Sequence, residues 1–159
     1  MPRYEAPIRD MKFIFHDVLS LQNYSNLDGF SDATPDIIDQ ILDEGGKFAS
    51  EVLFPLNKVG DEQGCKRADD ASVKTPDGFP GAYQQFVENG WPLLAKSPEH
   101  GGQGLPKLLA TALSEMVSSA NMAFGMYPGL TSGAYDALMA GGSDDQKAMY
   151  GPKMASGEW

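Results

Sequence analysis

The sequence has very few of the residues that build disulfides and transition-metal sites. Its 159 residues include one cysteine, Cys65, and two histidines, His16 and His100. One cysteine cannot form an internal disulfide, so the chain does not require an oxidising compartment. Zinc sites need three or four nitrogen or sulfur ligands at short spacings, and these three residues stand far apart along the chain. We therefore expect neither a disulfide framework nor a metal site.

Positive charge and long apolar runs are also scarce. The sequence has 12 lysines and arginines against 22 aspartates and glutamates, which gives a net charge of −10. This balance argues against nucleic-acid binding and against docking on anionic lipid. No apolar run approaches the roughly 18 residues of a membrane span, and residues 1–10 lack the apolar segment of a signal peptide. We expect a cytoplasmic chain with no nucleic-acid or membrane partner.

Motifs of nucleophilic and phosphate chemistry are missing as well. There is no Gly-x-Ser-x-Gly elbow, and Cys65 has basic neighbours but no base placed beside it. The glycine-rich string at 101–104 lacks both the Lys-Ser/Thr ending and the preceding strand of a phosphate loop, so we interpret it as a turn. The carboxylates between residues 28 and 44 mostly fit one solvated helix face. No catalytic residue is predicted in this chain.

Helical periodicity is the main pattern that the sequence does contain. Residues 34–59 show it best, with Thr34 as the expected N-cap and Pro35 at the first helical position. Gly45 and Gly46 should weaken the middle of this helix, and Pro55 should kink or end it. Two neighbouring stripes form its apolar face: Ile37, Ile41, Phe48, Val52 and Leu56, and beside them Ile38, Leu42, Ala49 and Leu53.

The other segments alternate between helical and turn-rich composition. Helices are expected over 80–90, 107–123 and about 130–140, and a last helix follows a cap at Ser143 or Asp144. Residues 60–79 and 97–106 are expected to be loops, and a break is expected at 124–129. Residues 8–23 favour a helix, although their β-branched and aromatic content leaves a strand open. The prediction is an all-α bundle of five to six helices with no convincing strand.

The stretch at 124–134 differs from the rest because it combines Met, Tyr and Pro with small residues near a helix start. Small residues let a ligand approach the backbone closely, and methionine adapts to varied apolar shapes. The stretch is therefore either one wall of a pocket or ordinary core packing.

Two ordered motifs resemble the acyl-CoA dehydrogenase family. PEHGGQGLP at 98–106 precedes an apolar helix, and GSDDQKAMYGPKMASGEW follows at 142–159. Order and spacing match the family's GGxG-type loop and its later G-(S/N)-(D/E)-x-Q-K-x-x-Y segment. Gly151 stands where the family usually has leucine. The matching residues are Gly142, Asp144, Gln146, Lys147, Tyr150, Pro152 and Gly157.

The front of the chain resembles a bacterial subgroup of that family, the subgroup of the 3-methylmercaptopropionyl-CoA dehydrogenases. YEAPIRDMKFIFHDVL at 4–19 is similar to its short N-terminal extension, and PLNKVGDEQGC at 55–65 also fits. The resemblance implies an N-terminal extension over 1–33 and the family's N-terminal helical domain over 34–159. It also implies a longer parent protein, whose middle β-domain and C-terminal helical domain are absent from this chain.

The resemblance further implies what the parent does. It would oxidise an acyl-CoA thioester with FAD held mainly between the two absent domains. The family's catalytic glutamate lies far beyond Trp159, so this fragment is expected to be inactive and to bind no FAD. A gap-free count back from Gly142 places the family's acyl-chain wall on 125–133. The wall residues would be Met126, Pro128, Gly129, Leu130 and Gly133.

Expected partners follow from the same resemblance. They are the acyl-CoA substrate, the remaining domains, a second copy in a homodimer or homotetramer, and electron-transfer flavoprotein as the electron acceptor. Two alternatives remain open. The chain could be a stand-alone helical interaction module of the same fold, or a damage-response relative that binds DNA, although its charge does not support the latter. If domains are missing, bare apolar faces should make the isolated chain self-associate or be marginally stable.

Overall fold

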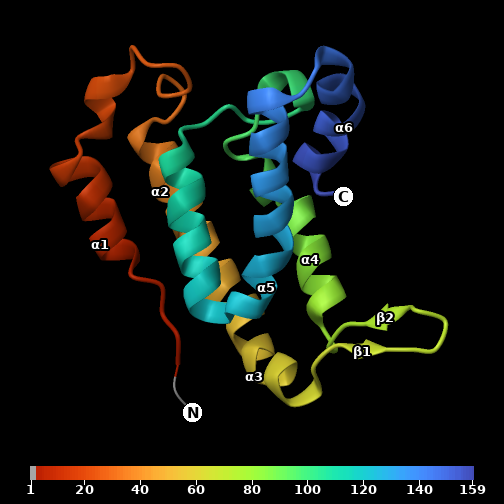
Figure 1. Ribbon diagram of the computed structural model, residues 1–159. Coiled ribbons are helices and arrows are strands. Elements are labelled where there is room, and N and C mark those ends of the chain that lie inside the picture. The colour runs from red at the N-terminus through yellow and green to blue at the C-terminus, as the bar shows by residue number, and fades with distance from the viewer. Residues whose placement is uncertain (1–2) are drawn as a thin grey trace.

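The computed structural model describes residues 3–159 as an array of helices lying side by side, with one small hairpin protruding at an edge (Figure 1). The described residues contain six α-helices, several short 3₁₀ and π turns, and two strands of two residues each. The all-α prediction is confirmed. The small hairpin is a correction, because no strand was expected.

The N-terminal segment is helical, so the strand alternative for 8–23 is wrong. Helix α1 (Ile8–Phe13) continues into a π turn (Ile14–Val18), and a 3₁₀ turn (Leu21–Tyr24) follows. Met11 and Phe15 are both 6% exposed and four residues apart. That spacing places them on one helix face, which packs on the core.

Helix α2 (Pro35–Lys47) runs through a π segment (Phe48–Leu53) into α3 (Phe54–Gln63). The Oγ1 of Thr34 accepts a hydrogen bond from the Ile37 N–H at 3.5 Å, as its predicted cap role requires. Of the two effects predicted for Pro55, a kink or an end of the helix, the end is wrong, because the helix continues into α3. In the π segment the Phe54 N–H donates to the Ala49 carbonyl, five residues back instead of four. The helical hydrogen bonds are therefore already displaced by one residue before Pro55, which has no N–H to donate.

The region expected to be a loop at 60–79 needs two corrections. Helix α3 extends to Gln63, and strands β1 (Lys66–Arg67) and β2 (Val73–Lys74) then pair antiparallel, with Lys66 opposite Lys74. Strands of two residues are too short to show the alternation of apolar and polar residues that predicts a strand. Helix α4 (Phe79–Glu88) follows as predicted, and two 3₁₀ turns (Trp91–Leu93 and Pro98–His100) lead onward.

Helix α5 (Lys107–Gly141) is two arms joined at Asn121, whose φ of −156° and ψ of 88° are not helical. The first arm (107–120) and the return arm (122–141) run in opposite directions side by side (Figure 1). The break expected at 124–129 is therefore misplaced, and Pro128 lies within the return arm. Asn121 starts that arm because its Oδ1 accepts from the Phe124 N–H at 3.0 Å, while its Nδ2 donates to the Leu53 carbonyl at 3.1 Å.

Helix α6 (Asp144–Ser156) begins with a complete capping box between Ser143 and Gln146. Ser143 is therefore the cap, rather than Asp144. The reciprocal hydrogen bonds explain why both residue types stand in the motif: each satisfies one of the unpaired N–H groups at the helix start.

The core lies between the N-terminal segment, α2 with the π segment that follows it, α4 and the two arms of α5. Phe124 is 1% exposed, and its ring lies 5.8 Å from that of Phe86 and 6.3 Å from that of Phe48, centroid to centroid. Of the two apolar stripes of the long helix, the one with Ile38, Leu42, Ala49 and Leu53 is almost fully buried. The other stripe is only partly buried, since Ile37 is 38% exposed.

Candidate functional site

The outer face of the return arm is apolar and uncovered. Met122, Met126 and Leu130 are 60%, 59% and 74% exposed, although large apolar side chains usually lie inside. Four-residue spacing places the three side chains on one helix face. Gly129 and Gly133 fall on the same face, so these five residues are called the outer face below.

The glycines of this face have no packing partner inside the chain. A Cβ atom built on Gly129 or Gly133 would meet nothing within 4 Å among the described residues. A glycine inside a helix costs about 1 kcal/mol relative to alanine. Internal packing does not explain that cost, whereas close approach of something from outside would.

Four of the five predicted wall residues, Met126, Gly129, Leu130 and Gly133, lie on the outer face. The fifth, Pro128, lines a cavity of about 220 Å³ behind the arm, with Gly125 and Gly129 beside it. Met122 was missed by the sequence reasoning, although its position four residues before Met126 was the signal that could have found it. The structure brings together one exposed strip of five residues, and Gly129 of that strip also borders the cavity that Pro128 lines.

The inner side of the return arm is fixed by a polar cluster. Lys96 is 7% exposed, and its Nζ donates to Ser132 Oγ at 2.9 Å and lies 4.2 Å from the centre of the Tyr135 ring. Asp136 joins the cluster with an oxygen 3.6 Å from Lys96 Nζ and another 2.6 Å from Lys107 Nζ. Burial lowers the pKa of Lys96, and the charge of Asp136 opposes that effect. These contacts hold the arm in place and leave its outer face free.

A second contact on the inner side of the return arm involves His100 and Gly151, the residue that departs from the family pattern. Tyr135 Oη lies 2.8 Å from Nδ1 of His100. A Cβ on Gly151 would come within 2.9 Å of the His100 ring. Gly151 therefore gives α6 room to pack directly against His100, and a leucine there would require the histidine to move.

The glycine-rich loop is a packed turn. A Cβ on Gly102 would lie 2.1 Å from the Lys96 carbonyl oxygen, which only glycine avoids. The N–H groups of Gly102, Gln103 and Gly104 donate to the carbonyls of Ser97, Leu93 and Lys96 at 2.9, 2.9 and 3.0 Å. The loop thus has its donors in use and its turn role is confirmed.

The remaining candidates for chemistry are isolated. Cys65 is exposed, and its Sγ lies 3.9 Å from Tyr127 Oη. Burial is the main cause that raises the pKa of Tyr127, and the hydrogen bond with Cys65 adds to it. Within residues 3–159, no group of three His, Cys, Asp or Glu side chains is placed to hold a metal ion. Over the same residues, every helix is too short or too polar to cross a bilayer.

Comparison with known proteins gives a consistent result. Residues 39–158 match the family described as "Acyl-CoA dehydrogenase, N-terminal domain". The chain is 42% identical to 3-methylmercaptopropionyl-CoA dehydrogenase of Ruegeria pomeroyi over 156 residues. These aligned residues make up 98% of this chain and 26% of that relative. It is 33% identical over 160 residues to a butyryl-CoA dehydrogenase of Syntrophomonas wolfei, again 98% of this chain and 26% of the relative.

A more distant relative extends the same pattern. The broad-specificity linear acyl-CoA dehydrogenase FadE5 of Mycobacterium tuberculosis is 28% identical over 148 residues, which is 92% of this chain and 24% of the relative. The chain therefore spans about a quarter of the length of the curated relatives that it matches.

Proposed function

The chain belongs to the acyl-CoA dehydrogenase family as its N-terminal domain, and on that premise we propose that it forms one wall of an acyl-binding site. The wall is the outer face of the return arm. The parent protein would be an acyl-CoA dehydrogenase that introduces an α,β double bond into an acyl-CoA thioester. Residues 1–33 would be an N-terminal extension and 34–159 the helical domain proper.

The observation that carries the proposal is the pair of open glycines between large exposed apolar side chains. An alkyl chain lying along Gly129 and Gly133 would approach the helix backbone closely. Met126 and Leu130 would cover it from the side and displace water, which is the favourable term in binding an apolar chain. Pro128 would act from behind, because it lies on the cavity side of the same turn.

The glycine-rich loop does not fit the diphosphate of FAD. The only glycine-rich loop in residues 3–159 already donates its backbone N–H groups to its own carbonyls, so it has no cradle to offer an anion. Held by the other domains of the parent, FAD would supply the redox chemistry of the reaction. We assign no flavin-binding residue and no catalytic base to this chain, and we expect the fragment alone to be colourless and inactive.

The remaining partners are proposed from the family. They are the acyl-CoA substrate, the other domains of the parent chain, further copies in a homo-oligomer, and electron-transfer flavoprotein as electron acceptor. A cytoplasmic location is proposed with them. The stand-alone interaction module remains the competing proposal, since an uncovered apolar face also suits a protein partner. The coding sequence after Trp159 distinguishes the two.

The test replaces Gly133 with leucine in the full-length parent protein. The added side chain should occupy the space proposed for the alkyl chain, so kcat/KM should fall about tenfold or more for long acyl-CoA substrates and much less for short ones. Steady-state kinetics over a series of acyl lengths measures this, and flavin absorbance reports the FAD content, which should stay unchanged.

Gly81→Leu on α4 is the matched control, because a Cβ there also meets nothing within 4 Å. It should leave the chain-length profile as it is. Equal effects of both variants, or a loss at Gly133 that is the same for every acyl length, would contradict an acyl-binding role for the outer face.

A further inference from the structure

One buried charge, that of Lys96, joins the glycine-rich turn before α5 to the return arm. Lys96 is 7% exposed, and a lysine is almost never buried to this extent unless its charge is paired. An apolar side chain of similar length would avoid the free-energy cost of burying a charge. The contacts of the Lys96 ammonium group therefore indicate what the charge does.

Three groups of the return arm surround that ammonium group. Ser132 Oγ accepts a hydrogen bond from Lys96 Nζ at 2.9 Å, an Asp136 oxygen lies 3.6 Å from Nζ, and the centre of the Tyr135 ring lies 4.2 Å from it. An ammonium group has three N–H donors. Residues three and four apart on a helix are neighbours on its surface. A single side chain thus holds one turn of the arm at three points.

The glycine-rich turn fixes the main chain from which Lys96 reaches the arm. The Gly104 N–H donates to the Lys96 carbonyl at 3.0 Å. A Cβ on Gly102 would lie 2.7 Å from Lys96 Cβ, so the turn packs closely against the lysine. Because of this packing, the Lys96 main chain cannot shift unless the turn shifts with it. The side chain therefore holds the arm from a fixed point.

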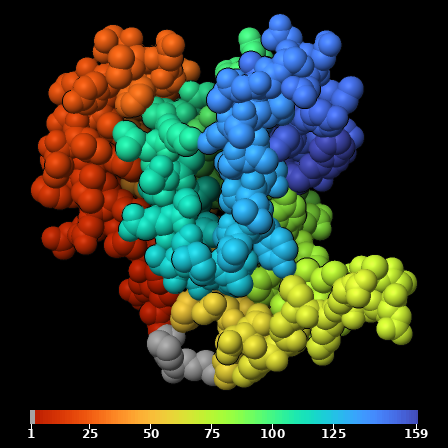
Figure 2. All heavy atoms as spheres, in the orientation of Figure 1, coloured from red at the N-terminus to blue at the C-terminus, as the bar shows by residue number. Residues whose placement is uncertain are grey.

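The return arm has a second anchor near its start. Phe124 is 1% exposed and packs in the hydrophobic core. Between Phe124 and the turn that Lys96 holds, the inner side of the arm borders the cavity of about 220 Å³ at Pro128 and Gly129. In the view of Figure 2 no other element lies over the arm, so its support comes from the inner side. Residues 126–133, which carry the proposed wall, thus lie between two fixed ends.

We propose that Lys96 is a positioning residue for the acyl wall and thereby sets the preference for acyl-chain length. The inference rests on the proposed function, because the wall that Lys96 positions is the outer face of the return arm. Without the charge, the turn at 132–136 loses its hold, and the neighbouring Leu130 and Gly133 move with it. A long acyl chain contacts more of the outer face than a short one, so the movement costs it more binding free energy. Lys96 itself lies on the inner side of the arm and acts only through the arm.

The first test is Lys96→Met in the full-length parent protein. Methionine is close to the lysine stem in length and has neither the charge nor the N–H donors. KM for dodecanoyl-CoA should rise about tenfold, roughly the effect of losing the fit of one methylene, whereas KM and kcat for butyryl-CoA should stay within about twofold. Rates are expressed per bound flavin, so that a loss of folded protein does not enter the comparison.

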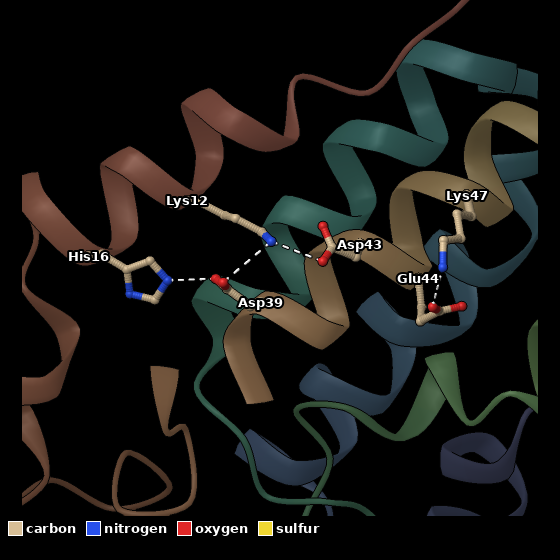
Figure 3. A network of polar contacts seen from close by, with 6 residues as sticks. All are labelled: Lys12, His16, Asp39, Asp43, Glu44 and Lys47. Carbon is tan, nitrogen blue, oxygen red and sulfur yellow. Dashed lines mark hydrogen bonds and ion pairs between the residues drawn. The ribbon is translucent and has the colours of Figure 1, made fainter. Parts of the chain in front are cut away.

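Lys12→Met is the matched control, because it removes another lysine that is held by carboxylates. Lys12 Nζ lies 2.9 Å from Asp43 and 3.3 Å from Asp39, and it joins α1 to α2 instead of holding the return arm (Figure 3). This variant should lower stability and leave the chain-length profile unchanged. Lys96→Arg is the conservative variant. It keeps the charge and can stack on Tyr135, so KM for dodecanoyl-CoA should stay within about threefold of wild type.

Ser132→Ala keeps the proposal falsifiable if Lys96→Met does not fold. It removes one hydrogen bond at the same turn and leaves the other two contacts of Lys96 in place. KM for dodecanoyl-CoA should rise about threefold, as the loss of one hydrogen bond predicts. The melting temperature should stay near that of wild type.

Two results would overturn the positioning role. One is an equal loss of kcat for both substrates in Lys96→Met with KM unchanged, which a general structural defect would produce. The other is an unchanged KM for dodecanoyl-CoA in both Lys96→Met and Ser132→Ala. Gly133→Leu tests the wall separately. If it alters the chain-length profile while the Lys96 and Ser132 variants do not, the positioning role fails and the wall stands; if it leaves the profile unchanged, the wall fails and the positioning role fails with it.

Discussion

Glycines occur in the middle of two helices of this protein, and they have opposite surroundings. In α2 they are surrounded: a Cβ on Gly46 would press on Ile8, and one on Gly45 would lie 3.0 Å from Met116 and 3.1 Å from Leu113. In the return arm of α5, Gly129 and Gly133 face open space. The sequence suggests the same weakness in both helices. The surroundings show that α2 gains close packing in exchange, whereas the arm gains nothing from this chain.

The comparison predicts that substitutions at enclosed glycines damage folding and that substitutions at open glycines do not. The largest effect is expected at Gly102, the enclosed glycine of the turn before α5. Gly102→Ala would put a methyl group 2.1 Å from the Lys96 carbonyl oxygen, and backbone cannot move aside as a side chain can. We expect a loss of about 3 kcal/mol in unfolding free energy by urea titration. A change below the error of the titration would show that the turn is more pliable than its contacts indicate.

The next effect is expected at Gly46, where α1 sits on α2. Gly46→Val should displace Ile8 and Ala6 and cost about 2 kcal/mol in the same titration. Gly46→Ala is the companion variant. Its methyl group meets only the movable end of Ile8 and Ala6 Cβ, and alanine favours the helix by about 1 kcal/mol, so the net change should be small. Equal losses of unfolding free energy for the valine and alanine variants would contradict a steric role for Gly46.

Open glycines should behave in the reverse way. Gly129→Ala in the 159-residue chain should raise the unfolding free energy by up to about 1 kcal/mol, because the helix gains propensity and nothing is crowded. In the parent protein the same variant should lower kcat/KM for long acyl substrates, since a methyl group then occupies the proposed wall. A variant that is more stable but kinetically unchanged would count against the acyl-wall proposal while leaving the packing comparison intact.

The smallest effect is expected at the ion pairs that join the N-terminal helical segment to α2. Lys12→Met should cost about 0.5–1 kcal/mol near neutral pH, as partly exposed pairs usually do. Lys47→Met, which removes an exposed pair with Glu44, is the control and should cost less.

The pH dependence of that loss follows from the direction of two pKa shifts. The hydrogen bond with His16 is the main cause that lowers the pKa of Asp39, and the hydrogen bond and charge of Lys12 lower it further. The part due to Lys12 is present above about pH 4 and is lost as the pH falls through the lowered value. The hydrogen bond with Asp43 is the main cause that raises the pKa of Lys12. The contribution of Lys12 is present below about pH 10 and is lost as the pH rises through the raised value. Wild type and Lys12→Met should therefore differ most between these limits, and an unchanged difference outside them would contradict the ion-pair origin.

Much of the fold could be predicted because local rules and tertiary packing agree. The Thr34 cap, the Ser143 capping box and the helical periodicity through α2 each specify a helix without help from distant residues. The predictions failed where distant contacts decide. Asn121 reverses the chain because its side chain bonds both to Leu53, 68 residues away, and to Phe124. Pro55 is tolerated because the π segment before it shifts the hydrogen-bond ladder. No short sequence window contains the contact of Asn121 with Leu53, whereas the shift before Pro55 is local and was missed because helical spacing alone does not reveal a π segment.

The candidate site divides in the same way. Family motifs and a gap-free count selected residues 125–133, and helical spacing could have added Met122. The direction of each side chain could not be predicted, because apolar and small residues occur all round the return arm. Only the position of the arm against Lys96 and the cavity separates Pro128 from Met126 and Leu130.

The sequence by itself determined the helices, most of their caps, the family, and the scarcity of groups for metal or nucleophilic chemistry, because these depend on residue type and short-range spacing. The tertiary structure decided which glycines are enclosed and which are open, where α5 turns back, and which apolar faces stay uncovered. The physical reason is that a glycine or a methionine has the same local propensity on either side of a helix. Its role depends on what the fold brings within 4 Å of it, and nothing within residues 3–159 covers the outer face.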